Sequence, residues 1–192
     1  MKTLMLTLAL WNPIVGLDGV VQRMAQESRR PALEGPMRSM TKIGKPLNVI
    51  AALLAIALLD PVGVPTARLA VVALAATNVV VEVTKRAVNR TRPDGESKPS
   101  NASFPSSHAA NAFALAAVFA RRWRRLGVVF WIWAAAVAWS RVYLHRHYLS
   151  DIVIGAAVGI LCTWLIARWL GPRWEVRREV EGPPRDVSPE VA

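Results

Sequence analysis

The chain has 192 residues and a formal net charge of +11, and it is 53% hydrophobic but only 19% charged. Its apolar residues fall in long blocks separated by short clusters of Arg, Pro and Gly, which is typical of a membrane protein and excludes an ordinary soluble core. Arginine at the ends of such blocks faces anionic lipid headgroups, so the net charge does not indicate binding of nucleic acid. The single cysteine, Cys162, excludes an internal disulfide.

Two segments of different character precede the strongest apolar blocks. Thr3–Val15 is apolar but short for a span at about 1.5 Å rise per residue, so it either crosses the membrane or lies in the interface. No small-residue cleavage site of a signal peptide follows it. Over residues 17–42 apolar residues recur at helical spacing, interrupted by Pro31 and Pro36. This pattern predicts an interfacial amphipathic helix, with a solvated linker as the alternative.

Five apolar blocks then predict membrane-spanning helices: Pro46–Leu59, Thr66–Val83, Ala109–Ala120, Leu126–Trp139 and Ile152–Leu170. Each is shorter than the about 20 apolar residues of a typical span, and tilt and snorkelling Lys or Arg side chains supply the difference. We therefore expect an all-α, integral-membrane helical bundle of five to six transmembrane helices. Its domain comprises residues 1–172, and residues 173–192 form a charged, Pro-containing tail.

The alternation of helices places two polar loops, Lys85–Pro105 and Arg141–Asp151, on one face of the membrane. The cluster Arg121–Arg125 lies on the other face, and its four arginines favour the cytoplasmic side. We therefore expect the two polar loops to be extracytoplasmic. The Ala- and Arg-rich composition of a compact chain favours a bacterial protein, and hence the inner membrane.

The first polar cluster contains Lys85 and Arg92, which are seven positions apart. This spacing predicts that both lie on one side of a helix extending past the membrane, with Pro93 turning the chain after it. Two cations held in one direction suit an anion with several oxygens, such as phosphate. Snorkelling anchors at the end of a span are the alternative.

The other two clusters combine helix starts with histidines. Ser106, Ser107 and His108 immediately precede an apolar helix, where they either cap it or form an anion site with its free N–H groups. His147 and Asp151 are four positions apart. On a helix the carboxylate reaches the imidazole, fixes its tautomer and leaves the other nitrogen as a nucleophile or base. A plain N-cap role for Asp151 is the alternative.

In order and spacing the three clusters resemble the signature of the type 2 phosphatidic-acid phosphatase superfamily, whose soluble relatives include vanadium haloperoxidases. That signature reads K-x6-R-P, then P-S-G-H, then S-R-x5-H-x3-D. The matching residues are Lys85 with Arg92-Pro93, Pro105-Ser106-Ser107-His108, and Ser140-Arg141 with His147 and Asp151. One position departs from the signature, because Ser107 stands where the family usually has Gly.

The resemblance implies a metal-independent phosphatase without a cofactor, acting on the phosphomonoester or diphosphate of a membrane lipid. His147, oriented by Asp151, would form a phosphohistidine, and His108 would protonate the leaving oxygen. The phosphate oxygens would be held by Lys85, Arg92, Ser106, Ser107 and Arg141. The expected partners are this lipid substrate and membrane lipids.

Several alternatives stay open at this point. The sequence does not choose among undecaprenyl diphosphate, phosphatidylglycerophosphate, phosphatidate and lipid A as substrate, and it leaves the oligomeric state undetermined. A vanadium-dependent peroxidase is disfavoured because those relatives are soluble. A non-catalytic membrane binder or transporter of anionic lipid is the alternative from another functional class.

Overall fold

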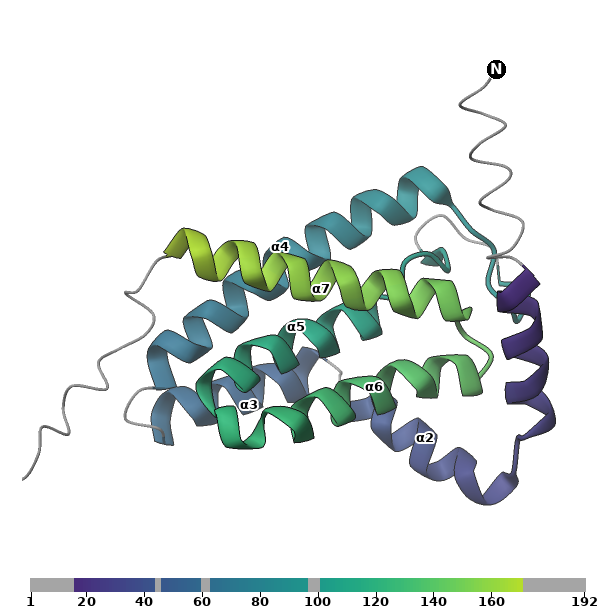
Figure 1. Cartoon of the computed structure of the whole chain (residues 1–192), viewed down its shortest axis with the longest axis horizontal. Helices are drawn as coiled ribbons and strands as arrows, with labels where there is room; N and C mark the ends of the chain where they lie inside the picture. Colours follow the sequence, from purple (N-terminus) through teal and green to yellow (C-terminus); the bar gives the residue numbers. More distant parts are fainter. Residues whose placement is uncertain (1–15, 44–45, 60–62, 97–100, 171–192) are drawn as a thin grey trace, which may run out of the picture.

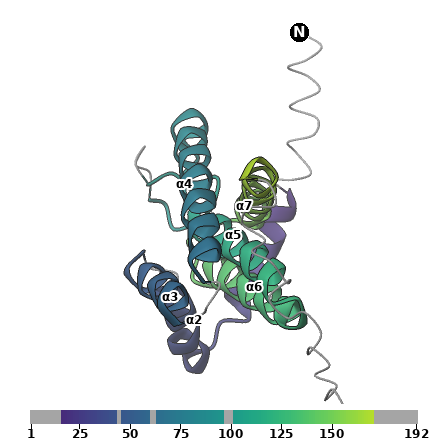
Figure 2. The ribbon, with the colours of Figure 1, turned by 90° about the vertical axis from the view of Figure 1, so that its left-hand side faces the viewer.

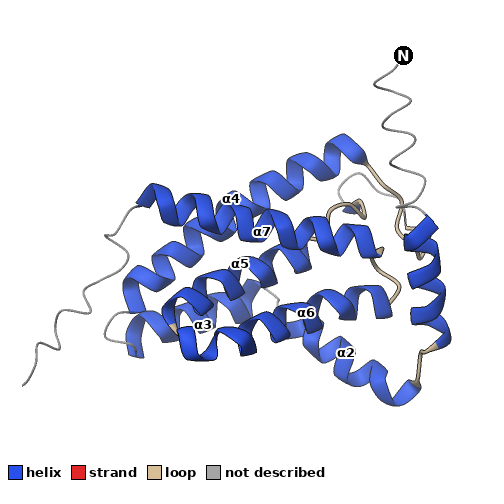
Figure 3. Ribbon diagram, viewed as in Figure 1, coloured by secondary structure: helices blue, strands red, loops and turns tan. Residues whose placement is uncertain are grey.

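A computed structural model describes residues 16–43, 46–59, 63–96 and 101–170, and all the regular structure within these ranges is helical (Figure 3). The predicted all-α class is therefore confirmed for this part of the chain. The predictions for Thr3–Val15 and for the tail 173–192 lie outside the described residues.

The helices pack side by side into a bundle (Figure 1). A helix over residues 16–27 comes first, followed by α2 (Pro31–Ile43), α3 (Pro46–Leu59), α4 (Gly63–Val88), α5 (Ser107–Arg122), the short 3-10 helix η2 (Arg124–Leu126), α6 (Gly127–Tyr143) and α7 (Leu149–Leu170). Each of the five predicted apolar blocks thus falls essentially within one helix, from α3 to α7. By length and composition, α4, α7 and the stretch Arg124–Tyr143 can cross a membrane. The chain is accordingly an integral membrane protein, while five to six spans remains a prediction.

Helix α5 occupies the middle of the bundle, where it packs against α4, α6 and α7 (Figure 2). Small residues allow a close approach of α7, as is common between membrane helices. A Cβ atom at Gly159 would lie 2.1 Å from the carbonyl oxygen of Ala110, and one at Gly155 would lie 2.6 Å from that of Ser106. The N-terminal halves of α5 and α7 are therefore close together, and both carry predicted site residues.

The N-terminal segment differs from the single amphipathic helix predicted over residues 17–42. Residues 28–30 separate the helix of residues 16–27 from α2, and Pro31 is the first residue of α2, where a fixed φ and a missing N–H are tolerated. Pro36 lies inside α2. Both stretches are helical, which excludes an irregular linker over these residues. The interfacial position of this segment stays a prediction.

The helix of residues 16–27 packs across the end of the bundle at which the α4–α5 and α6–α7 connections lie, whereas the α5–α6 connection lies at the opposite end (Figure 1). Ala25 from this helix joins a buried apolar cluster with residues of α5, α6 and α7, namely Ala109, Ala138, Val142 and Ile152. The described parts of both predicted polar loops are thus at one end of the bundle, next to this N-terminal helix.

Candidate active site

The first cluster does not lie on one helix, so the prediction that α4 extends through Arg92 is wrong. Helix α4 ends at Val88, and Asn89 adopts a φ of 45°, a left-handed conformation typical of a helix end. The N–H of Asn89 donates to the carbonyl of Lys85 at 2.9 Å. The chain therefore leaves the helix axis before Arg92 is reached.

Lys85 and Arg92 are nevertheless brought near one another, because both bind the loop that precedes α5. Lys85 Nζ donates to the carbonyl of Ala102 at 2.6 Å. Arg92 donates from Nε to the carbonyl of Asn101 at 2.8 Å and from Nη2 to its side-chain oxygen at 2.5 Å. Both side chains are buried, and burial lowers the pKa of Arg92. The loop, and not a shared helical face, brings the two cations together.

The second cluster forms the start of α5. Ser106 is its N-cap, with a hydroxyl that accepts from the N–H of Ala109 at 3.4 Å, and it is completely buried. Its own N–H donates to the carbonyl of Asp151 at 3.0 Å. Ser107 and His108 follow in the first turn, where backbone N–H groups lack intrahelical acceptors. The capping role and an anion-binding role of this segment are therefore compatible.

The third cluster begins at the end of α6 with Arg141. Its Nη1 donates to Thr41 of α2 at 3.3 Å, while its buried Nε has no hydrogen-bond partner. The N–H groups of Arg146 and His147 both donate to the carbonyl of Arg141, at 2.9 and 3.2 Å. The connection thus folds around the end of α6 and directs His147 into the protein.

His147 is 1% exposed, and its hydrogen bonding defines its tautomer. Nδ1 lies 2.8 Å from the carbonyl oxygen of Ser103 and 3.5 Å from Asp151 Oδ2. A carbonyl can only accept, so Nδ1 carries the proton and Nε2 keeps its lone pair. The pKa of His147 is lowered to about 4, mainly by burial and further by the positive charges of Arg141 and Arg92, against the opposing effect of Asp151. His147 is therefore a neutral base with one available nitrogen.

Asp151 combines orientation with helix capping. Its Oδ2 accepts from the hydroxyl of Ser103 and, at 2.8 Å, from the N–H of Tyr148, the residue before α7. This second bond is the reach-back half of a capping box. Its Oδ1 accepts from Arg90 at 2.8 Å. Asp151 is thus not the N-cap of α7 but its third residue, from which its carboxylate both caps the helix and contacts His147.

His108 precedes the apolar part of α5 and is partly buried. Its pKa is lowered to about 3, first by burial and then by the positive charge of Arg141, with further contributions from His147, Arg92 and Lys85. These electrostatic effects place His108 within the same cluster of side chains. In the part of the chain that the structure describes, no group of three or more His, Cys, Asp or Glu side chains could hold a metal ion.

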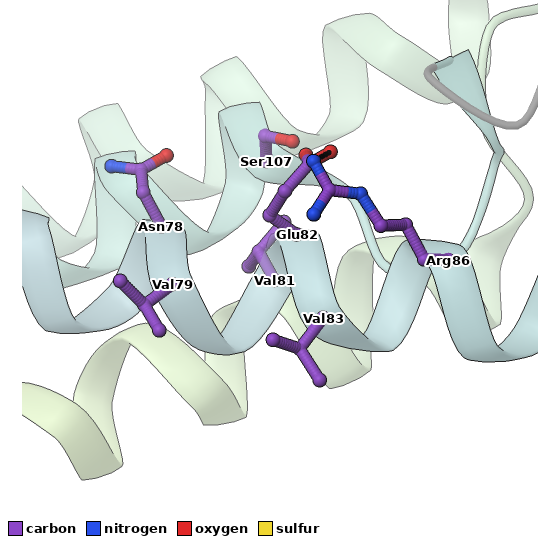
Figure 4. Close-up of a pocket in the computed structure, with 7 residues that line it drawn as sticks. All are labelled: Asn78, Val79, Val81, Glu82, Val83, Arg86 and Ser107. Carbon is purple, nitrogen blue, oxygen red and sulfur yellow. Dashed lines mark ion pairs between the residues drawn. The ribbon is translucent and has the colours of Figure 1, made fainter.

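A groove of about 440 Å³ opens beside this cluster, between α4 and the start of α5 (Figure 4). It is lined by Asn78, Val79, Val81, Glu82, Val83, Arg86 and Ser107. Arg86 pairs with Glu82 at 3.1 Å on its surface. Ser107, the position that departs from the family signature, adds its hydroxyl to the groove.

The sequence did not single out Arg90, Asn101 or Ser103, although each contacts a predicted site residue. Arg90 belongs to the same basic cluster as Lys85 and Arg92, so its charge was a usable signal. Asn101 and Ser103 act largely through backbone carbonyls, for which the residue type gives no signal. All eight predicted residues, in contrast, lie at one end of the bundle.

The fold and the site define a helical membrane protein with buried cations and two imidazoles gathered at one end of the bundle. Residues 66–175 match the PAP2 superfamily, and the chain therefore belongs to this superfamily. The resemblance read from the three clusters is confirmed at the level of the family.

Two curated relatives carry phosphatase names. The chain is 42% identical over 66 residues to a lipid A 4'-phosphatase of Bacteroides thetaiotaomicron, covering 32% of this chain and 28% of the relative. It is 32% identical over 108 residues to a decaprenylphosphoryl-5-phosphoribose phosphatase of Mycobacterium tuberculosis, covering 53% and 59% of the two chains. The chain thus spans less than two thirds of the length of either relative.

A solved structure shares the fold. The transmembrane PAP2-type phosphatidylglycerolphosphate phosphatase of Bacillus subtilis superposes with a TM-score of 0.70 at 21% identity, covering 88% of this chain and 90% of that one. This similarity confirms the arrangement of helices in the bundle.

Proposed function

We propose that this protein is a phosphatase that hydrolyses the phosphomonoester or diphosphate of a membrane lipid. The observation that carries the proposal is the buried, neutral His147, whose Nδ1 donates to Ser103 and whose Nε2 is left available. The phosphatase names of the relatives support the same class of reaction.

Phosphoryl transfer would proceed in two steps. His147 Nε2 attacks phosphorus and forms a P–N bond, while the bond from phosphorus to the lipid oxygen breaks and protonated His108 gives that oxygen its proton. The negative charge of the bound phosphate would raise the pKa of His108 from the value of about 3 in the free protein, so that His108 carries this proton. Water then attacks the phosphohistidine, His108 takes the proton of the water, and His147 is released with inorganic phosphate. Asp151 stabilises the positive charge that develops on the imidazole of His147.

Fixed positive charge supplies the stabilisation that this reaction needs without a metal. Lys85, Arg92 and Arg141 are anchored through bonds to Ala102, Asn101 and Thr41, so their positions are set before substrate arrives. The buried Nε of Arg141 has no partner, which is costly unless a phosphate oxygen accepts from it. The hydroxyl of Ser106 and the amides of Ser107 and His108 at the start of α5 would complete the phosphate site.

The wider setting is part of the same proposal. The phosphatase domain comprises residues 1–172 with five to six spans, and its site faces the extracytoplasmic side of a bacterial inner membrane. The relatives are named for lipid A and for a decaprenyl-linked sugar phosphate, which share only a phosphate at the membrane surface. The substrate class is therefore a lipid phosphate, with the tail left open.

The test is phosphate release by the purified protein in detergent over a panel of lipids: undecaprenyl diphosphate, phosphatidylglycerophosphate, phosphatidate and lipid A. We expect His147→Ala to abolish release, because the nucleophile is lost. Asp151→Asn should slow release about a thousandfold or more, as for the orienting aspartate of other His-dependent sites. An exposed pair on α2 supplies the control: Arg38, 3.5 Å from Glu34, can be changed to Gln without loss.

Two further arms address the mechanism and the functional alternative. Turnover should persist in EDTA, whereas loss that a divalent ion restores would contradict metal independence. Full activity of His147→Ala would contradict the phosphohistidine. If the wild-type protein binds these lipids without releasing phosphate from any of them, the non-catalytic binder is the better description.

A further inference from the structure

Arg90 connects the catalytic pair to the N-terminal helix. Its Nη1 lies 2.8 Å from Asp151 Oδ1, and its Nη2 lies 2.8 Å from Asp18 Oδ2. The side chains of the three residues are 14%, 0% and 3% exposed, in the order Arg90, Asp151 and Asp18. One guanidinium fork thus joins two buried carboxylates, an arrangement that the compact ammonium of lysine could not reproduce.

Further bonds hold this arrangement in one geometry. Asp18 accepts from the N–H of Ser150 at 2.8 Å and from its hydroxyl at 2.5 Å, so the helix of residues 16–27 is fixed to the first turn of α7. Arg90 Nη1 also donates to the Ser150 hydroxyl at 2.7 Å. The guanidinium carbon lies 4.0 Å from the ring centre of Tyr148, a cation–π contact. Arg90 is therefore held from several sides beside Asp151.

The partners of Arg90 separate it from the cations assigned to phosphate. Lys85 donates to a backbone carbonyl, Arg92 to the backbone and amide of an asparagine, and Arg141 to a hydroxyl. Those neutral acceptors leave the positive charge available to an anion. Arg90, in contrast, already pairs with two carboxylates. Its charge is directed at Asp151 and not at a substrate.

We propose that Arg90 and Asp18 are positioning residues for the reaction proposed above: Arg90 keeps Asp151 ionised and oriented, and Asp18 holds Arg90. The inference rests on the proposed function, because it concerns the pair of His147 and Asp151. It makes the helix of residues 16–27 part of the catalytic apparatus as well as a membrane-surface segment.

The two oxygens of Asp151 have different partners, and this explains how Arg90 would act on His147. Oδ1 is bound by Arg90, so the carboxylate is fixed with Oδ2 toward Ser103 and His147 Nδ1. Without Arg90 the carboxylate can rotate, and a buried charge loses its guanidinium partner. Either change weakens the stabilisation of the charge that develops on His147, which affects the chemical step and not the capture of phosphate.

Arg90→Gln and Asp18→Asn test the proposal in the phosphate-release assay. We expect kcat to fall about 10- to 100-fold, the loss that is typical when a residue that orients a metal-binding side chain is replaced. KM should stay near that of the wild type, because the phosphate-binding cations are untouched. Arg90→Lys, which keeps the charge but not the fork, should have an intermediate kcat.

A double-mutant cycle separates action through Asp151 from an independent structural effect. In the Asp151→Asn background, Arg90→Gln should cause no further loss of kcat, since the carboxylate that it orients is already gone. Arg38→Gln is the control, because Arg38 lies on α2 and its side chain is 63% exposed in its pair with Glu34. It should retain the wild-type kcat.

Each outcome decides a different claim. Losses that multiply in the double mutant, or a wild-type kcat in Arg90→Gln beside an impaired Asp151→Asn, would overturn the inference alone. Full activity of Asp151→Asn would overturn the proposed catalytic pair, and the inference with it. Melting temperatures in detergent identify any variant that fails to fold, and if Arg90→Gln does so, Asp18→Asn and Arg90→Lys in the same cycle decide the matter.

Discussion

His147 differs from a surface histidine in two respects: its proton is fixed on one ring nitrogen, and its pKa is lowered. The carbonyl of Ser103 holds the proton on Nδ1. Burial lowers the pKa to about 4, compared with an ordinary value near 6.5. Because the pKa is lowered, the neutral, nucleophilic form is present at every pH above about 4. The protein thus keeps the imidazole of His147 uncharged over the range in which most histidines titrate.

This shift predicts the acid limb of the pH profile. If His147 is the nucleophile, kcat/KM should not fall between about pH 7 and 5 through protonation of the enzyme, because that group titrates only near pH 4. The measurement is phosphate release at several pH values, corrected for the substrate phosphate, whose second pKa lies near 6. A corrected limb centred near 6.5, the ordinary pKa of histidine, would contradict the buried environment of His147.

Residue spacing was enough to predict which residues gather at one end of the bundle, but not all of their contacts. His147, Asp151 and the cations follow from a pattern in the sequence. The acceptor that fixes the tautomer is a backbone carbonyl, which every residue has, so no pattern could identify Ser103. Asp18 lies 132 positions from Ser150, to which it binds, and its role becomes visible only in three dimensions.

At the scale of the elements, hydropathy located the helices better than it located their ends. The block Pro46–Leu59 coincides with α3, but α4 continues five residues past the predicted end at Val83 and then stops at Val88. Lys85 belongs to the last turn of α4, where a polar residue can still be helical because its side chain reaches a loop carbonyl. The end itself depends on the left-handed φ of Asn89, a local choice that hydropathy does not register.

The contact between α5 and α7 predicts a strong effect at Gly159. Gly159→Ala places a Cβ 2.1 Å from the carbonyl of Ala110, so the two helices must separate. Overpacking of this kind costs about 1–3 kcal/mol, and we expect a lower melting temperature in detergent together with a lower kcat. Gly35→Ala in α2 is the control, since its Cβ would have no neighbour within 4 Å and alanine favours a helix. Equal melting temperatures for the two variants would contradict the close α5–α7 contact.

For the whole molecule, the bundle places the candidate site and the arginine cluster Arg121–Arg125 at opposite ends. The connections that carry the site lie beside the helix of residues 16–27, and the arginines of residues 121–125 lie at the far end (Figure 1). Alternation of the helices already predicted this separation from the sequence. Which end faces the cytoplasm is set during membrane insertion and not by the bundle itself, because arginine-rich connections are retained in the cytoplasm.

Cysteine labelling tests that direction. In a Cys162→Ala background, Ser28→Cys adds an exposed thiol at the site end, and Leu126→Cys adds one at the far end without changing any arginine. We expect a membrane-impermeant maleimide to label Ser28→Cys in intact spheroplasts and Leu126→Cys only after permeabilisation, because four arginines beside Leu126 hold that end in the cytoplasm. The wild-type chain is the control, since Cys162 is buried. The reverse pattern would place the site in the cytoplasm, and the substrate would then have to present its phosphate on the inner leaflet.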